Sequence, residues 1–383
     1  MKTSQMAIFF TVVFTIYFIG NLYIYLKGYN SIETFRRHRI VYFISFLLLA
    51  LTFVAAKIIE SRHSSVFSDI LNIIGGFWMA FLLYGFILLL LSDIVSLPLK
   101  IAGILNEGNL HLFRKWSFTG TLIITSFLIV AGFINAVSPV IKEYQLTINK
   151  GAGDIRELRI AAVSDIHLGS IIRKRSIKKM SEMLKSVKPD LVLLLGDVVD
   201  GEMGPVLRDD LLSYFRCPDC KYGLYAITGN HEYIGGPQKT IPYIESKGIR
   251  ILKDEKITIP GGIQLIGRID RDSKRFSGRE RIPLKELMNG VDTAKPVILL
   301  DHQPFNLNEA ADNGVDLQLS GHTHNGQMWP LNLLTKKIYE VSYGYLKKGN
   351  TQYIVSSGFG IWGPRIRLGS RSEILFIKIR FAG

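Results

Sequence analysis

Five short polar motifs lie in the second half of this sequence of 383 residues. They offer carboxylate, amide and imidazole groups, which suit Mn, Fe or Zn ions. Two such ions, held about 3.5–4 Å apart, supply a hydroxide nucleophile and stabilise an in-line displacement at phosphorus. The residue types therefore predict a two-metal site for phosphoester hydrolysis. The motifs are Asp165-Ile-His167, Gly196-Asp197-Val-Val-Asp200, Gly229-Asn230-His231-Glu232, Asp301-His302 and Gly321-His322-Thr323-His324.

A short apolar run precedes most of these motifs and has the length and composition of a β-strand. Strands that alternate with helical segments predict an α/β layered fold, and continuous apolar runs fit strands covered on both faces. Because catalytic residues gather at strand ends in such folds, we expect the motifs to meet there. The expected strands cover residues 158–164, 190–195, 223–228, 296–300 and 315–320, with an amphipathic helix over 173–187.

Each motif also has a simpler structural interpretation. An Asp-x-His triplet occurs by chance, Gly-Asp-x-x-Asp is typical of a turn with an Asx hydrogen bond, and Gly-Asn-His is typical of a type I′ or II turn. Two histidines at positions i and i+2 of a loop, such as His322 and His324, rarely serve packing. The presence of all five motifs in this order favours the metal site. Asp197 lies between the other ligand sets in the sequence and is the natural bridge between two ions.

The order of the motifs resembles that of the calcineurin-like metallophosphoesterase superfamily, over about residues 155–380. Segments 321–327 and 356–369 are similar to its YkuE/YaeI-type branch, and the apolar region before them is similar to its transmembrane members. The resemblance implies a β-sandwich flanked by helices, two divalent ions (Mn, Fe or Zn), and His231 as the acid near the leaving group. It also implies two overlapping ligand sets, which are Asp165, His167, Asp197 and His324 for one ion and Asp197, Asn230, His302 and His322 for the other.

Four further polar residues lie near these motifs. Arg365 and Arg367 carry guanidinium groups suited to bidentate phosphate contact, and we expect either substrate binding or a surface strand with ion pairs. Asp301 is either an outer partner of a ligand histidine or merely polar. Asp270 either touches the substrate or stabilises a turn, and the turn is the simpler interpretation.

The first third of the chain is strongly apolar and contains four stretches near the ~20 residues needed to cross a bilayer. They cover about residues 6–26, 40–58, 70–92 and 117–139, and the first has no evident cleavage site, so we expect an uncleaved helix. Asp93 is expected at the membrane interface, with residues 94–105 along the surface. We therefore predict a membrane domain over 1–140, a linker and approach to the first strand over 141–156, and a catalytic domain over 157–383.

The Lys and Arg residues in the loops predict the orientation, because cytoplasmic loops are enriched in both. Seven lie in the loops after spans one and three, against three on the other side, which places the catalytic domain outside the cytoplasm. Counting Lys142 and Lys150 narrows the margin to seven against five. The seven are Lys27, Arg36, Arg37, Arg39, Lys100, Arg114 and Lys115, and the three are Lys2, Lys57 and Arg62.

The formal charge of +14 fits anionic lipid headgroups and basic cytoplasmic loops. No nucleic-acid partner is expected, because the sequence contains no recognition helix, zinc finger or aromatic RNA-binding motif. Cys217 and Cys220 form a lone Cys-Pro-Asp-Cys motif, which predicts a local loop, with a short-range disulfide if the domain faces an oxidising compartment.

Three functional hypotheses follow. The first is a membrane-anchored phosphohydrolase that acts outside the cytoplasm on a lipid or envelope phosphoester by attack of a metal-bound hydroxide. The second places the same chemistry in the cytoplasm, as a pyrophosphate hydrolase of a lipid-linked nucleotide sugar such as UDP-2,3-diacylglucosamine. The third is a transporter or sensor with an inactive domain, which the intact ligand set argues against. The expected partners are the lipid bilayer and a phosphoester substrate, and the sequence predicts no oligomeric state.

Overall fold

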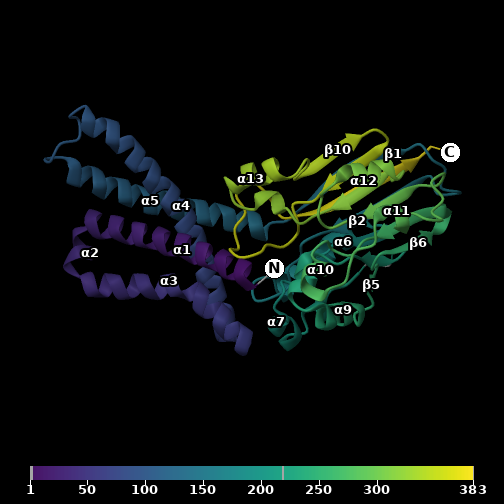
Figure 1. The fold of residues 1–383 in the computed structure, drawn as a ribbon, viewed down its shortest axis with the longest axis horizontal. Helices are drawn as coiled ribbons and strands as arrows, with labels where there is room; N and C mark the ends of the chain where they lie inside the picture. Colours follow the sequence, from purple (N-terminus) through teal and green to yellow (C-terminus); the bar gives the residue numbers. More distant parts are fainter. Residues whose placement is uncertain (1–2, 218–219, 383) are drawn as a thin grey trace. The chain divides into compact units, whose positions relative to one another are not determined.

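The structure is a computed structural model that describes residues 3–217 and 220–382. Its contacts separate the described chain into two units (Figure 1). One is helical and extends to Phe133, together with Gly363–Ile366; the other is an α/β unit that contains Ile134–Trp362 and the residues from Arg367 onward. Lys2, which entered the count of loop charges, and the central Pro218-Asp219 of the Cys-Pro-Asp-Cys motif lie outside the described residues.

Four helices of the N-terminal region are long and apolar enough to cross a membrane, as the sequence predicts. The third continues to Ile101 instead of ending near residue 92, because Pro98 lies in its last turn and does not stop it earlier. The helices are α1 (Thr3–Ser31), α2 (Glu33–Arg37), α3 (Arg39–Arg62), α4 (Val66–Ile101) and α5 (Leu110–Val137), and all but the short α2 are candidate spans.

Asp93 joins two of these helices. Its carboxylate accepts a hydrogen bond of 2.6 Å from the Tyr23 hydroxyl and forms an ion pair with Lys27, so α1 and α4 are tied at this level. Asp93 is thus a paired, half-exposed carboxylate near the end of an apolar stretch, and its position at the membrane interface stays a prediction.

The α/β unit contains two sheets of six strands each. In the first sheet β2, β3, β4 and β5 run parallel, and in the second β7, β8, β9 and β11 run parallel. The first sheet has the order β1 (Val140–Ile148), β12 (Glu373–Phe381), β2 (Glu157–Val163), β3 (Leu191–Leu194), β4 (Leu224–Ala226), β5 (Arg250–Ile251). The second has the order β10 (Gly344–Lys348), β11 (Thr351–Val355), β9 (Leu317–Ser320), β8 (Val297–Leu300), β7 (Ile263–Gly267), β6 (Glu255–Ile259).

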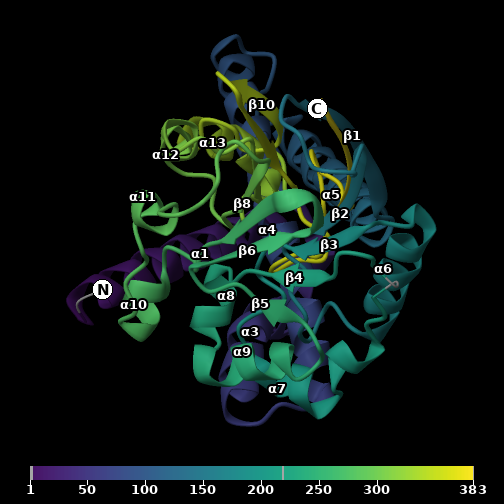
Figure 2. The ribbon, with the colours of Figure 1, turned by 90° about the vertical axis from the view of Figure 1, so that its right-hand side faces the viewer.

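The two sheets pack face to face, with helices on their outer faces (Figures 1 and 2). Successive strand residues point to opposite faces, so Ile160 lies in the core between the sheets, whereas Ala161 packs outward against α6. The helices of this unit are α6 (Lys174–Val187), α7 (Met203–Arg208), α8 (Asn230–Ile234), α9 (Pro237–Glu245), α10 (Ser273–Ser277), α11 (Leu284–Leu287), α12 (Leu307–Asp312) and α13 (Leu331–Ile338), with 3-10 turns η1 (Leu211–Tyr214), η2 (Pro260–Gly262) and η3 (His324–Gly326). The predicted layered fold, a β-sandwich flanked by helices, is confirmed.

The stretch expected as a linker is a strand instead. Residues 140–148 form β1, which pairs in parallel with β12 from Val140 opposite Glu373 to Ile148 opposite Phe381. Only Ser138 and Pro139 lie between the end of α5 and the start of this strand. Its side chains alternate, and Leu146 and Ile148 are buried, so the period of two drives the pairing.

Candidate metal centre

The five motifs lie just beyond the ends of five parallel strands. Asp165 and Asp197 follow β2 and β3 of the first sheet, and Asn230 follows β4 at the start of α8. His302 and His322 follow β8 and β9 of the second sheet. The two sheets therefore bring their motif-bearing edges together, as expected for residues at the carboxyl ends of strands.

One group of ligand-type side chains consists of Asp165, His167 and His324, all buried. The Nε2 atoms of the two histidines face each other at 3.1 Å, and the Nε2 of His324 lies 3.4 Å from Asp165 Oδ1. The Asp165 carboxylate accepts the main-chain N–H of His322 at 3.0 Å, which fixes its orientation. Two nitrogens and an oxygen thus converge within the reach of a single ion.

A second group consists of Asp197, His302 and His322. His302 Nε2 lies 3.1 Å from Asp197 Oδ2, and His322 Nδ1 lies 3.0 Å from the Asn230 side-chain oxygen. Asp197 Oδ2 is also 3.7 Å from His167 Nε2 of the first group. Asp197 therefore stands between the two groups, where a bridging carboxylate would lie.

The donor atoms of these groups fit metal ions. His302 Nδ1 bonds the Leu195 carbonyl at 2.7 Å, whereas its buried Nε2 has no hydrogen-bond partner although it points at Asp197. His167 Nδ1 bonds Asp200 at 3.0 Å, which again leaves Nε2 for the centre. A histidine that binds a metal with one nitrogen and an outer oxygen with the other has this arrangement.

The electrostatics agree with this assignment. Burial and the nearby His302 lower the pKa of His322 to about 3, and burial and His167 hold the pKa of His324 well below its ordinary value. Burial alone would raise the pKa of Asp197, but the imidazoles of His302 and His231 hold it well below its usual range. Neutral imidazoles and ionised carboxylates are the forms that bind metal.

Two other histidines carry an opposite shift. Burial alone would lower the pKa of His167 and His302, but the hydrogen bond to Asp200 raises the first, and the charge of Asp197 raises the second well above its ordinary value. Protons and metal ions therefore compete for these two side chains, because only a deprotonated ring nitrogen binds a metal.

The loops that carry the ligands have an uncommon backbone conformation. Asp165, His167, Asp197, His322 and His324 all have positive φ values, between 48° and 71°. Asp and His enter this left-handed region more readily than most residues, yet the cost is still of the order of 1–3 kcal/mol per residue. Such conformations persist only where surrounding contacts hold them. The contacts around these loops therefore fix the positions of the ligand-type side chains.

Glycine is required where two of these loops touch. A Cβ at residue 229 would lie 2.1 Å from Asp197 Oδ1, and one at residue 321 would lie 1.7 Å from Ser164 Oγ. The glycines of Gly-Asn-His-Glu and Gly-His-Thr-His therefore allow the loops to approach closely. A larger residue at either position would push the neighbouring loops apart and move the ligand-type residue that follows it.

Glu232 locks two of the loops together, a role that the sequence did not reveal. Its buried carboxylate accepts the main-chain N–H groups of Gly229, Asp197, Val198 and Val199 at 2.7–3.2 Å. Burial and the charge of Asp197 raise its pKa to about 7. The only sequence signal was its place at the end of the Gly-Asn-His-Glu motif.

We expect Glu232→Ala to lower the free energy of unfolding by about 3–5 kcal/mol, because four buried N–H groups lose their acceptor. Metal affinity should fall with it, since Asp197 loses its support. Thermal unfolding of the full chain and bound metal per chain would be measured. The control is Glu182→Ala on the exposed face of α6. Its free energy of unfolding should stay within about 0.5 kcal/mol of the wild-type value. Equal stability of the two variants would refute a locking role for Glu232.

His231 lies beside the first group but is more open to solvent. Its side chain is 21% exposed, its ring centroid is 4.5 Å from that of His167, and its Nδ1 is 3.6 Å from Asp200 Oδ1. The same Asp200 oxygen accepts from His167. Asp200, to which the sequence assigned no role, therefore faces both a ligand-type histidine and the expected acid; its place in Gly-Asp-x-x-Asp was the available signal.

Arg367 does not form the surface strand or the substrate contact that the sequence predicts. It is fully buried and donates to the carbonyls of Gly358 and Gly360 and, at 3.3 Å, to His324 Nδ1. Its guanidinium thus lies behind His324, and burial lowers its pKa to about 10. Arg365 groups with the helical unit, where its guanidinium lies 5.9 Å from the centre of the Phe133 ring.

Two aspartates also have structural partners. Asp301 pairs with Arg268 and Arg281, so it does not orient His302. The backbone carbonyl of Leu195 has that role. Asp270 accepts both side-chain hydrogen bonds of Gln303, at 2.9 and 3.0 Å, together with the N–H of Asp272, as expected for a turn residue.

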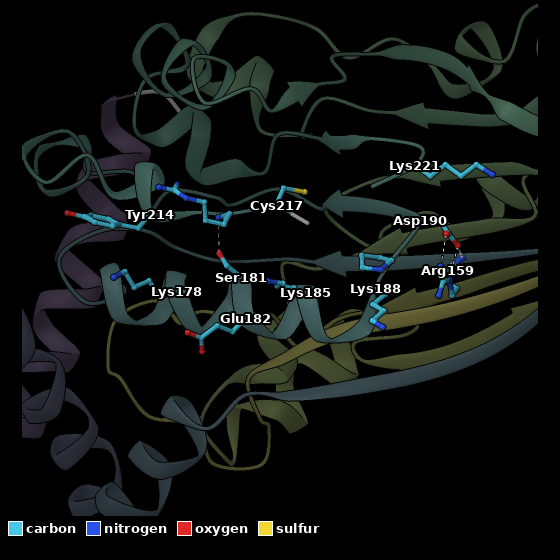
Figure 3. A pocket seen from close by; sticks show the side chains of 12 residues that line it. Arg159, Lys178, Ser181, Glu182, Lys185, Lys188, Asp190, Tyr214, Cys217 and Lys221 are labelled. Atoms are coloured by element: carbon cyan, nitrogen blue, oxygen red, sulfur yellow. Dashed lines mark hydrogen bonds and ion pairs between the residues drawn. The ribbon is translucent and has the colours of Figure 1, made fainter. Parts of the chain in front are cut away.

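A large cavity lies at the other end of the first sheet (Figure 3). It has a volume of about 940 Å³ between α6 and the start of β2, β3 and β4, and it is distant in the fold from the ligand groups. Cys217 lines it, and its Sγ lies 3.8 Å from that of Cys220. The basic residues of its lining are Arg159, Lys178, Lys185, Lys188, Arg216 and Lys221.

Known proteins are similar to this chain in sequence. Residues 158–326 match the family of calcineurin-like phosphoesterases. An uncharacterized metallophosphoesterase of Aquifex aeolicus is 33% identical over 229 residues, which cover 59% of this chain and 87% of that protein. The chain belongs to the calcineurin-like phosphoesterase family and is a metal-dependent phosphoesterase.

Two further relatives are similar to more of this chain than the matched family region, and one of them is named as a transmembrane protein. An uncharacterized metallophosphoesterase of Campylobacter jejuni is 29% identical over 381 residues, covering 97% of this chain and 98% of that protein. A transmembrane protein with metallophosphoesterase domain of Danio rerio is 31% identical over 274 residues, covering 68% of this chain and 62% of that protein. The chain itself contains four helices that are long and apolar enough to cross a membrane.

Proposed function

We propose that this protein cleaves a phosphoester bond of a lipid or envelope substrate at the outer face of a cell membrane. The observation that carries the proposal is a ligand cluster centred on Asp197 in a chain with four helices able to cross a bilayer. A catalytic domain tethered in this way meets membrane-bound substrates at high effective concentration.

The two ligand groups would hold two divalent ions, of Mn, Fe or Zn. Asp197 would contribute to both sites. When bound, such ions supply a hydroxide nucleophile near neutral pH and stabilise negative charge on the phosphoryl oxygens. The proposed ligands are Asp165, His167, Asp197 and His324 for one ion and Asp197, Asn230, His302 and His322 for the other.

His231 is the proposed general acid. Its ring is partly exposed beside the cluster, and its Nδ1 faces Asp200, which leaves Nε2 for the departing oxygen. Asp200 lies on the side of the ring away from the proposed position of the leaving group, with its Oδ1 3.6 Å from Nδ1. Proton transfer from such a positioned group contributes about 10²–10⁴-fold to rate.

The proposed outer location rests on the seven-to-three excess of Lys and Arg in the loops after spans one and three. We expect an alkaline-phosphatase fusion at the C-terminus to be active and a fluorescent-protein fusion there to be dark. A fusion after residue 106, in the loop between α4 and α5, is the matched control and should give the reverse pattern.

An inactive alkaline-phosphatase fusion and a bright fluorescent-protein fusion at the C-terminus would contradict this orientation. The cytoplasmic alternative would then be favoured, namely pyrophosphate hydrolysis of a lipid-linked nucleotide sugar such as UDP-2,3-diacylglucosamine.

A substrate panel tests the function itself. The full chain is purified in detergent, stripped with a chelator, and reloaded with Mn, Zn, Fe, Mg or Ca. Phosphatidic acid, phosphatidylglycerol, nitrophenyl mono- and diesters and a nucleotide sugar are then compared. We expect metal-dependent turnover with the highest kcat/KM on a lipid phosphoester. No turnover of any ester with any metal would reject the proposal.

A further inference from the structure

Both ends of helix α13 lie close to the ligand cluster. It follows the loop of His322 and His324, and its first turn lies against η3, because a Cβ at Gly326 would come within 2.3 Å of the Asn332 nitrogen. At its other end, the ring centroid of Tyr339 is 6.3 Å from that of His322.

The outer face of α13 is apolar. Leu333, Leu334 and Ile338 are 58%, 55% and 53% exposed, and no residue of the helix is buried. Leu334 and Ile338 are four positions apart and share one face. Helices at the surface of soluble proteins turn such residues toward the core. The exposed apolar face of α13 therefore indicates contact with an apolar surface outside this domain.

Positive charge and tryptophan accompany this face. Lys336 and Lys337 are exposed on the same helix. Trp329, just before it, is 51% exposed. Trp362 is 53% exposed and is held by two hydrogen bonds with the side chain of Gln327. Leucine, lysine and tryptophan together are typical of a helix that lies in the interface of an anionic membrane.

Two aromatic side chains lie between the ligand cluster and the guanidinium of Arg271. Tyr339 packs on Phe305 with ring centroids 4.7 Å apart, and the guanidinium of Arg271 lies 4.8 Å from the centre of the Phe305 ring. Arg271 is exposed. The path from His322 outward therefore ends in a group that attracts anionic headgroups.

We propose that α13 lies in the headgroup–acyl boundary of an anionic bilayer and leads a lipid phosphoester into the ligand cluster. The acyl chains lie along Leu334 and Ile338, while the phosphate reaches the cluster past Tyr339. This inference rests on the proposed function and deepens it, because it names the substrate as an acylated phosphoester taken directly from the membrane. The occupant is lipid rather than protein because the same chain supplies four membrane helices and the face carries lysines.

The test compares two substrates with the same phosphate. The full chain with Leu334→Gln and Ile338→Gln is reconstituted into phosphatidylglycerol/phosphatidylcholine vesicles and assayed on phosphatidic acid and on its deacylated counterpart, glycerol 3-phosphate. We expect kcat/KM on phosphatidic acid to fall by about tenfold or more, since each aliphatic side chain contributes roughly tenfold when buried. Turnover of glycerol 3-phosphate should stay within about twofold, because neither side chain supports the core.

Two further variants sharpen the result. Leu207→Gln removes an aliphatic side chain of similar exposure, 51%, from α7, which lies on another side of the domain (Figures 1 and 2), and should change neither rate. Lys336→Glu with Lys337→Glu should slow phosphatidic acid hydrolysis in phosphatidylglycerol vesicles and much less in pure phosphatidylcholine.

The inference is overturned if the double glutamine variant slows both substrates equally, which would make α13 a support of the cluster, or if it slows neither. A change of oligomeric state with lipid turnover intact would assign the face to a second copy of the chain and also overturn it. A wild-type protein that hydrolyses glycerol 3-phosphate but no lipid refutes the inference alone. A wild-type protein that hydrolyses no ester refutes the proposed function.

Discussion

Asp197→Asn is expected to remove nearly all phosphoester hydrolysis and to leave fewer than two metal ions per chain. The carboxylate stands between the two ligand groups, 3.1 Å from His302 and 3.7 Å from His167, so loss of its charge weakens both. Removal of an outer partner of a metal ligand costs about 10–100-fold, and the loss of a shared ligand should exceed that range.

The measurements are turnover and metal content of the purified full chain. The matched control is Asp190→Asn, which changes an aspartate at the opposite end of the same strand, where it pairs with Arg159. That variant should keep both metals and its rate within about twofold. An Asp197→Asn protein with two ions and the wild-type rate would disprove the bridge.

His231→Ala is expected to slow hydrolysis of alkyl phosphoesters by about 10²–10⁴-fold and nitrophenyl esters far less. An alkoxide must be protonated as it departs, whereas nitrophenolate leaves without help. Because the ring lies beside the cluster and is partly exposed, both metals should remain bound.

The two esters act as internal controls for each other, and metal analysis accompanies both assays. Equal losses on the two esters would indicate stabilisation of charge rather than proton donation. Loss of metal would make His231 a ligand instead. A His231→Gln variant should resemble His231→Ala on alkyl esters, because an amide cannot supply the proton.

The strands that precede the motifs could be predicted because their apolar runs are continuous and end at polar residues. Leu191–Leu194 is buried on both faces, and such a run has few other structural uses. β1 was missed because its residues alternate and directly follow a membrane span, where a connection is the usual expectation. Its partner β12 is more than 200 residues away, and no local pattern specifies that pairing.

The ligand types were evident from the motifs, whereas their supports were not. Arg367 is buried because the chain around it wraps behind His324, and a sequence pattern with two arginines looks like an exposed strand. Glu232 and Asp200 hold their places through bonds to residues about 30 positions away. Such contacts depend on how the loops meet in space, and the spacing of the motifs does not determine them.

The buried carboxylate of Glu232 adds to the acidic groups around the ligand cluster. Asp165, Asp197 and Asp200 are further acidic side chains around the place where two divalent ions would sit, and Arg367 lies behind His324. With its pKa raised to about 7, Glu232 is only partly ionised at neutral pH. Protons and metal ions therefore compete for the same buried cluster of acidic side chains and histidines. Mild acid should therefore release metal ions from the centre, because the ligand side chains take up protons in their place.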